Sequence, residues 1–165
     1  MTVHPFPGPA TADAMLGNAA GAAVVADLRS VTPMVRTAVL MLRDWCDGPD
    51  GQLRVRSAFA DGLSAAEAQA GTHHFEALVR GLTLRGRRPF LRHALACRCV
   101  GADEAVFANL LAVAASGDHE DAMLIASLLV PGEVLPLVVN DAAQAGLAIR
   151  RIVLRQQSQR HAPLH

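Results

Sequence analysis

The pattern of apolar and polar residues from Asp103 to Val130 predicts two helices joined by a tight turn. Apolar side chains recur at helical spacing in the first arm, which should therefore bury one broad face. These residues are Val106, Phe107, Leu110, Leu111, Val113 and Ala114. Gly117 can end the first arm and Asp118 can cap the second, which is apolar on nearly every side until Pro131. We expect this apolar hairpin, over about residues 103–130, to be central to the fold, with its second arm in the interior.

The same signals divide the rest of the chain into further helices. Thr32 with Pro33, and Ser64 with Glu67, are typical of helix starts, and glycines follow several of the apolar runs. The predicted helices cover about residues 11–29, 33–47, 51–60, 65–85, 89–99 and 133–157. We therefore expect an all-α, compact single-domain bundle of about seven helices. The expected organisation is a flexible N-terminal arm (1–10), a helical domain (11–157) and a frayed C-terminal tail (158–165).

The amino-acid composition supports the helical class and argues against some classes of binding partner. Apolar residues make up 52% of the chain and aromatic residues only 4%, because alanine takes their place, and alanine favours closely packed helices. The 15 basic and 15 acidic residues cancel, so no net charge draws the chain to nucleic acid, and no stretch is apolar enough for a membrane span. Three cysteines are too few for a disulfide framework, which favours a reducing compartment. Every basic residue is arginine, which together with the many alanines suggests a GC-rich genome. We expect a cytoplasmic protein with reduced cysteines, encoded in a GC-rich bacterial genome.

One group of residues suits a metal ion. His93 and Cys97 are four residues apart, so a helix over 89–99 would put both on one face, and a terminal turn could bring Cys99 to them. His119, at the turn of the hairpin, could approach His93 as a further ligand if the helices alternate in direction. Thiolate and imidazole ligands favour zinc or iron as the cofactor. The alternative is that both cysteines are core packing residues and that His93 is a partly exposed helix residue.

A second candidate site is the basic segment Arg80–Arg98, which no carboxylate interrupts. Its middle part surrounds a predicted helix start, where free backbone N–H groups favour an anion or a phosphate group. The candidate anion-binding residues are Arg85, Arg87, Arg88 and Arg92. The alternative is a solvated turn whose arginines pair with the carboxylates of Asp103, Glu104, Asp118, Glu120 and Asp121. The absence of interleaved aromatic residues argues against nucleic acid as a partner.

No catalytic motif is present in the sequence. His73 and His74 with Glu76 form a third group, but adjacent histidines point to different sides of a helix and cannot chelate one ion together. The chain has no nucleophile elbow and no glycine-rich phosphate loop. Because such a search misses active sites assembled from distant residues, enzyme activity stays open, although a non-catalytic role is the expectation.

The apolar excess favours self-association. Mean hydropathy is +0.27, high for a soluble monomer of this size, which suggests that a second copy covers some apolar helix surface. The last predicted helix carries a stripe that could supply this surface: Leu135, Val138, Val139, Ala142, Ala145, Ile149, Ile152 and Val153. We therefore expect a non-catalytic protein–protein interaction or regulatory module that acts as a homo-oligomer, such as a homodimer, or binds another protein. The alternatives are a metal-binding protein or metalloenzyme, and a binder of anions or phosphate groups.

Overall fold

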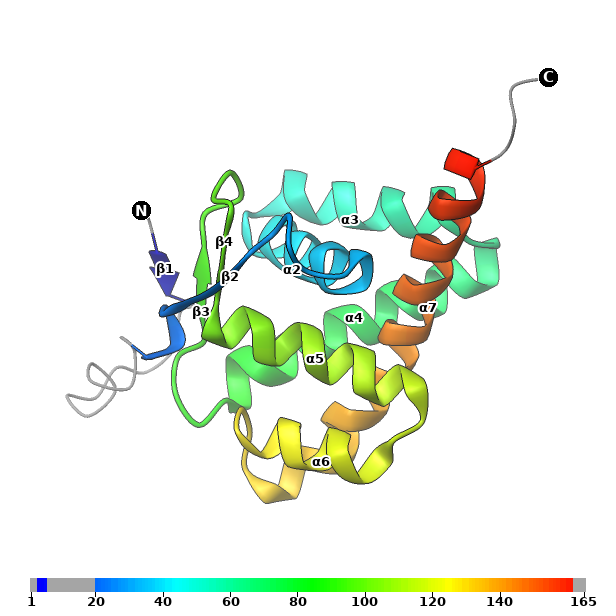
Figure 1. Cartoon of the computed structure of the whole chain (residues 1–165). Coiled ribbons are helices and arrows are strands. Elements are labelled where there is room, and N and C mark those ends of the chain that lie inside the picture. Colours follow the sequence, from blue (N-terminus) through cyan, green and yellow to red (C-terminus); the bar gives the residue numbers. More distant parts are fainter. Residues whose placement is uncertain (1–2, 6–19, 162–165) are drawn as a thin grey trace.

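Helices make up most of the structure, a computed structural model that describes residues 3–5 and 20–161. Six α-helices occur in these residues: α2 (Pro33–Cys46), α3 (Pro49–Gly62), α4 (Ala65–Arg85), α5 (Ala102–Ser116), α6 (His119–Ser127) and α7 (Leu135–His161). A short 3-10 helix, η1 (Gly132–Val134), precedes α7. Four short strands lie on one side of the helices: β1 (Val3–Pro5), β2 (Val24–Asp27), β3 (Leu91–His93) and β4 (Cys99–Gly101) (Figure 1). The expected all-α, compact fold of about seven helices is confirmed.

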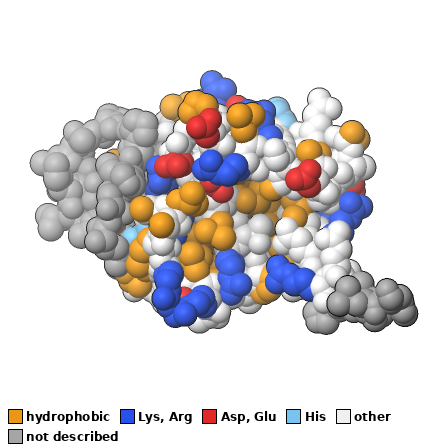
Figure 2. All heavy atoms as spheres, turned by 90° about the horizontal axis from the view of Figure 1, so that it is seen from above, with side chains coloured by type: hydrophobic (Ala, Val, Ile, Leu, Met, Phe, Trp, Pro, Cys, Tyr) orange, Lys and Arg blue, Asp and Glu red, His pale blue; other side chains and the backbone are white. Residues whose placement is uncertain are grey.

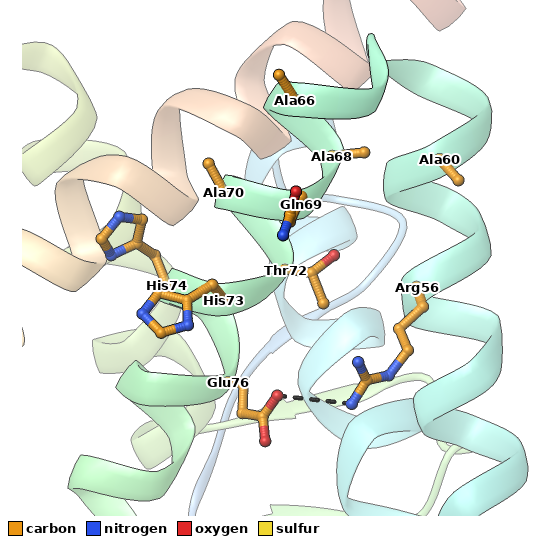
Figure 3. Close-up of a pocket in the computed structure, with 10 residues that line it drawn as sticks. All are labelled: Arg56, Ala60, Ala66, Ala68, Gln69, Ala70, Thr72, His73, His74 and Glu76. Atoms are coloured by element: carbon orange, nitrogen blue, oxygen red, sulfur yellow. Dashed lines mark ion pairs between the residues drawn. The ribbon is translucent and has the colours of Figure 1, made fainter.

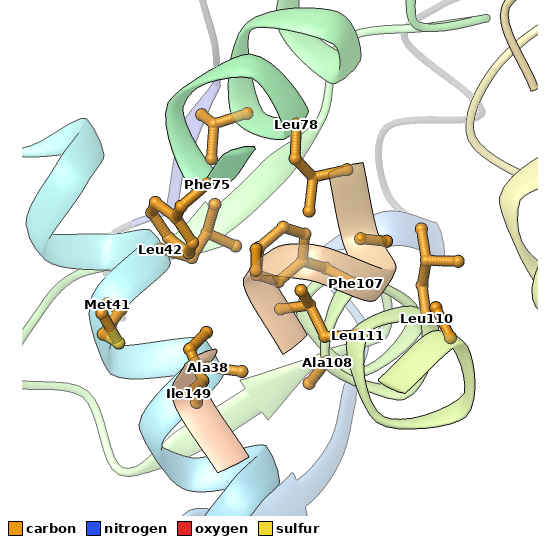
Figure 4. Close-up of a cluster of buried hydrophobic side chains, with 14 of the residues drawn as sticks. Ala38, Met41, Leu42, Phe75, Leu78, Phe107, Ala108, Leu110, Leu111 and Ile149 are labelled. Atoms are coloured by element: carbon orange, nitrogen blue, oxygen red, sulfur yellow. The ribbon is translucent and has the colours of Figure 1, made fainter. Parts of the chain in front are cut away.

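The helix α5 is central to the bundle. It packs against α2 and α7, and α7 in turn lies along α4 (Figure 1). Phe107 of α5 meets Phe75 of α4 edge to face, with ring centroids 6.2 Å apart, among buried leucines (Figure 4). Gly146 of α7 allows a close approach to α5, because a Cβ at this position would lie 2.3 Å from the carbonyl oxygen of Leu111. Small residues thus bring the central helices together, in keeping with the alanine-rich composition.

Local signals set several helix ends as predicted. The Thr32 hydroxyl accepts a hydrogen bond from the N–H of Val35 at 3.3 Å and so caps α2. The Glu67 carboxylate accepts hydrogen bonds from the backbone N–H and the hydroxyl of Ser64, at 3.1 and 2.7 Å, at the start of α4. Gly117 ends α5 with a φ of 87°, a conformation that favours glycine. Each of these helix ends is therefore determined by a hydrogen bond or a backbone conformation within one helical turn.

The predicted hairpin is present as α5 and α6, but its two arms are buried to different extents. α5 buries most of its length, whereas α6 has nine residues and buries only Ala122 and Ala126. Leu124 and Leu128 are 68% and 64% exposed. The expectation of an interior second arm is wrong, because α6 lies at the edge of the bundle and packs on one side only, against α5 and α7 (Figure 1).

Residues 89–99, expected to form a helix, instead form β3, a turn and the start of β4. β3 pairs antiparallel with β1, with Val3 opposite His93, and β4 pairs antiparallel with β2, with Asp27 opposite Cys99. Charged side chains from α2 and α5 bind the backbone groups that a helix would pair internally. The helical spacing of this segment is therefore overridden by tertiary hydrogen bonds.

The first predicted helix, over residues 11–29, is also wrong in its second half. Residues 24–27 form β2, whose backbone pairs with β4, and residues 11–19 lie outside the described part of the chain. Of the predicted N-terminal arm (1–10), the structure describes only β1.

At the other end, α7 continues through residues 158–161 of the predicted tail (158–165), and the last four residues lie outside the description. Among the described residues, no helix combines the length and the apolar character needed to cross a bilayer.

Candidate metal centre

A buried ion pair holds the segment between β3 and β4 from within the fold. Arg43 projects from α2, and its guanidinium donates to both carboxylate oxygens of Glu104 at 2.7 Å each. Both side chains have 0% exposed surface. The same guanidinium donates to the carbonyl oxygens of Ala94, Cys97 and Cys99, at 3.3, 2.6 and 2.6 Å. Arg43 therefore fixes the turn that carries both cysteines.

Two acidic side chains at the start of α5 hold the strands of this segment. Glu104 accepts hydrogen bonds from the backbone N–H groups of His93 at 3.0 Å and Gly101 at 2.9 Å. Asp103 accepts one from the N–H of Leu91 at 2.9 Å. A buried carboxylate is stable only with such partners. Because these backbone groups bond to side chains, they are not available for a helical hydrogen-bond ladder.

His93, Cys97 and Cys99 come together at this segment. One imidazole nitrogen and the two sulfurs all lie within 4.8 Å of one another. His93 is 1% exposed, and both cysteines are half-buried. In this structure the Sγ atoms of Cys97 and Cys99 are in disulfide contact, so the expectation that all cysteines are reduced is wrong for these two. The turn between β3 and β4 therefore brings the three candidate ligands together. They do not lie on a common helix face.

The two nitrogens of the His93 imidazole have different surroundings. Nε2 lies 3.1 Å from the carbonyl oxygen of Ala22, an atom that can only accept, so Nε2 carries the proton of the neutral ring. Nδ1 is then unprotonated, and it is buried without a hydrogen-bond partner among the described residues. Since buried polar atoms are nearly always paired, this lone pair needs an explanation.

This arrangement fits a metal ligand. A ligating histidine almost always donates its other ring N–H to a carbonyl or carboxylate, which fixes the orientation of the ring. Gly101 packs closely against the ring, because a Cβ at this position would lie 3.0 Å from both Cδ2 and Nε2 of His93. Two thiolates and one imidazole form a ligand set that suits zinc. No further histidine, cysteine or acidic residue in the described part of the chain belongs to this cluster.

His119 lies apart from the cluster. It is exposed as the first residue of α6, beyond the far end of α5. The 15 residues of α5 span about 22 Å and separate it from β4, which precedes α5. The approach to His93 that we expected required a helix over 89–99, and this segment is not helical.

Two arginines of the basic segment are bound to other groups of the chain. Arg88 donates from Nη1 to Oδ2 of the buried Asp103 at 2.7 Å, and this bond raises the pKa of Arg88 above its ordinary value. Arg87 donates from Nε to the carbonyl oxygen of Ser127 at 2.9 Å. Both guanidinium groups thus have structural partners, and Arg88 pairs with a carboxylate as the alternative interpretation of this segment expected.

The other two candidate arginines point to different places. Arg85 is exposed at the end of α4, whereas Arg92 of β3 donates from Nη2 to the carbonyl oxygen of Cys46 at 2.8 Å. The structure therefore does not bring the four arginines to one anion site. On the face seen from above, basic and acidic side chains are interspersed with exposed apolar ones (Figure 2).

The two adjacent histidines of α4 have different partners. His74 Nδ1 lies 2.8 Å from Oδ1 of Asp141, which joins α4 to α7. His73 lines a groove of about 710 Å³ between α3 and α4 (Figure 3). In the same groove Glu76 forms an ion pair with Arg56, with an N–O distance of 3.5 Å. Four of the ten lining residues are alanines, and the other six carry polar or charged side chains.

The apolar stripe of the last helix is covered within the chain. Its buried members pack among α4, α5 and neighbouring helices: Val138, Val139, Ala142, Ala145, Ile149, Ile152 and Val153. Leucines remain exposed elsewhere, including Leu124, Leu128 and Leu137. Self-association stays a prediction, and this stripe no longer supports it.

The sequence reasoning missed the ion pair of Arg43 and Glu104. Arg43 lies on the apolar stripe of α2, four residues after Val39 and three before Cys46, which is a signal of a buried charge. Its partner is 61 residues away, and no pattern in one sequence identifies it. Glu104 gives a weaker signal, because it lies three residues after Gly101, where an acid can return to the helix start.

Comparison of the chain with described protein families, curated proteins and solved structures gives no match. A function for this chain must therefore be inferred from the chemistry of its own residues.

Proposed function

We propose that this protein binds a thiophilic metal ion, zinc before iron, through Nδ1 of His93 and the thiolates of Cys97 and Cys99. The observation that carries this proposal is the buried Nδ1, which has no hydrogen-bond partner among the described residues, while Nε2 donates to the carbonyl oxygen of Ala22. A metal ion would satisfy this lone pair and two sulfurs of the same cluster.

The proposed site requires reduced cysteines. Zinc binds thiolates at about 2.3 Å in a tetrahedron, which places two sulfurs about 3.8 Å apart. A Cys97–Cys99 disulfide leaves neither sulfur as a thiolate. Its reduction takes two electrons from a reductant such as a dithiol or a phosphine, and two protons, which the dithiol carries itself and which water supplies when a phosphine is oxidised to its oxide. Metal binding then releases the thiol protons. Metal binding and disulfide formation therefore exclude one another.

The three ligands found among the described residues leave one coordination position for water or another ligand. Zinc sites of this kind are exchangeable or catalytic, whereas structural zinc sites have four protein ligands. Both cysteines are half-buried, so the fourth position would be within reach of solvent. Arg43 holds the carbonyl oxygens of both cysteines and supports the site from its buried side.

Metal binding by the reduced chain tests the proposal. Protein purified without a histidine tag and reduced with a phosphine should bind about one zinc ion per chain. Cobalt(II) in place of zinc should give thiolate-to-metal charge-transfer absorption. Cys97→Ser and Cys99→Ser should each weaken zinc binding by more than about tenfold in competition with a coloured chelator. Cys46→Ser and His119→Ala change the same residue types outside the cluster and should bind like the parent.

Oxidation provides an independent arm of the test. Treatment with diamide should abolish zinc binding, and a phosphine should restore it, because the disulfide and the metal compete for the same sulfurs. Zinc binding that persists in Cys97→Ser and Cys99→Ser, or the absence of charge-transfer absorption in the reduced chain with cobalt(II), would overturn the proposal. Stoichiometric iron in place of zinc would support the site and correct the ion.

A further inference from the structure

A groove near the end of α2 forms a second candidate site, separate from the metal centre. It is an open groove of about 560 Å³ between α2, the start of α3, α4 and β3. This volume lies within the range of small-molecule sites. Its walls include Trp45 of α2, Val79 and Leu84 of α4, and two arginines, Arg80 of α4 and Arg92 of β3.

The two arginines give the groove a positive charge that the rest of its lining does not balance. Arg92 makes one hydrogen bond to the carbonyl oxygen of Cys46, which leaves most of its guanidinium donors available. The side chain of Arg80 makes no hydrogen bond or ion pair within the described part of the chain. Glu76 is the acidic residue of the lining, and it already pairs with Arg56. The positive groove contrasts with the formal net charge of +0 for the whole chain.

Apolar surface lies in the same groove as these charges. Trp45 and Val79 are mostly buried in its wall, at 8% and 3% exposure, while Leu84 is 69% exposed at its side. We propose that the groove binds a small organic anion. Its carboxylate or phosphate group would lie between Arg80 and Arg92, and its apolar body would lie against Trp45 and Leu84.

This site does not depend on the metal centre. Arg92 and His93 are neighbours on β3, and successive side chains of a strand point to opposite faces. Arg92 therefore faces the groove and is half-buried, whereas His93 faces the interior and is fully buried. Ligand binding in the groove is expected with and without zinc.

The fluorescence of Trp45 provides a direct readout, because it is the only tryptophan in the chain. Titration with phenyl phosphate and with 3-phenylpropanoate should change this fluorescence saturably, with dissociation constants below about 1 mM. The two probes distinguish a phosphate ligand from a carboxylate ligand. Inorganic phosphate and the neutral 3-phenylpropan-1-ol each lack one half of the proposed ligand, and each should bind at least about tenfold more weakly.

Arg80→Gln is the decisive variant, because Arg80 makes no polar contact with the described residues that its loss would disturb. It should weaken the binding of whichever anion binds the parent by about tenfold or more. Arg85→Gln removes a charge from the same helix outside the groove lining and should bind like the parent. Arg92→Gln, checked by thermal unfolding, should behave like Arg80→Gln.

Three results would overturn this proposal. The first is that neither anion changes the fluorescence of Trp45 saturably. The second is that Arg80→Gln binds as tightly as the parent, and the third is that the neutral alcohol binds as tightly as the acids. Each result can be distinguished from failure of the metal proposal, because none of these measurements involves a metal ion.

Discussion

The guanidinium of Arg43 and the carboxylate of Glu104 form a two-point ion pair between residues that are 61 positions apart in sequence. Neither side chain has exposed surface, and the pair joins α2 to α5. Further hydrogen bonds from Arg43 reach the carbonyl oxygens of Cys97 and Cys99, and Glu104 accepts the N–H of His93. The backbone of all three candidate metal ligands is thus bound to one buried charge pair.

Breaking this pair should be strongly destabilising. We expect Arg43→Met and Glu104→Leu each to lower the free energy of unfolding by about 3–5 kcal/mol, because each leaves the opposite charge buried without its partner. The double variant should lose less than the sum of the two, since neither unpaired charge remains. Urea unfolding followed by circular dichroism measures all three values.

An exposed ion pair is the matched control for these variants. Arg29 pairs with Asp27 and its side chain is 71% exposed, so Arg29→Met should change the free energy of unfolding by less than about 1 kcal/mol. Similar losses for Arg43→Met and Arg29→Met would show that burial of the Arg43 pair does not determine its energy.

Gly101→Ala should disturb the metal ligand without removing it. The φ of Gly101 is −78°, which any residue can adopt, but the new Cβ would lie 3.0 Å from Cδ2 and Nε2 of His93. The ring must move and weaken its hydrogen bond to Ala22, so zinc affinity should fall by about 10- to 100-fold.

Gly132→Ala is the control for this substitution, because a Cβ there has no atom within 4 Å among the described residues. It should bind zinc like the parent in the same chelator competition. Equal affinities for Gly101→Ala and Gly132→Ala would mean that the orientation of His93 does not control binding.

Cys46 should react slowly with alkylating reagents. Burial raises the pKa of its thiol to about 12, against a partial opposing effect of Arg92. The reactive thiolate is then about 10⁻⁴ of the total at pH 8, and the alkylation rate should rise about tenfold per pH unit without levelling off below pH 11. A variant with Cys97→Ser and Cys99→Ser isolates this thiol for measurement by mass spectrometry. A rate that levels off near pH 9, as for an exposed thiol, would contradict the effect of burial.

The same shift in the pKa of Cys46 predicts how the contribution of this thiol to stability depends on pH. The unfolded thiol ionises near pH 9.0, whereas the folded thiol keeps its proton to about pH 12. The folded state therefore binds more protons in this window, and the contribution of Cys46 to stability is lost as the pH rises from about 9 to about 12. Cys46→Ala should show a smaller decrease in stability over this range.

Several elements could be predicted because their signals are local. Thr32 predicted the start of α2, Ser64 with Glu67 the start of α4, and Gly117 the end of α5. Each acts on backbone groups within a few residues, so neighbouring residues are enough to identify it. The apolar spacing around Phe107 likewise identified the central helix.

The residue types of the candidate site were identified from the sequence, but the structure brings these residues together in a different way from the one expected. His93 and Cys97 were grouped because four residues separate them on a helix, yet a turn between two strands brings them together. His119 was added on the basis of an arrangement of helices that does not occur. The apolar α6 was expected in the interior, although burial depends on neighbouring elements as well as on composition.

The sequence by itself determined the helical class and most helix ends of this protein, because helical periodicity and capping act within one or two turns. Only the tertiary structure decided that the segment with Cys97 and Cys99 is not helical and that His93 lies beside them. It also decided that Arg80 and Arg92 share a groove. These outcomes depend on bonds such as that of Arg43 to Glu104, between residues that meet only after folding and whose energy depends on burial.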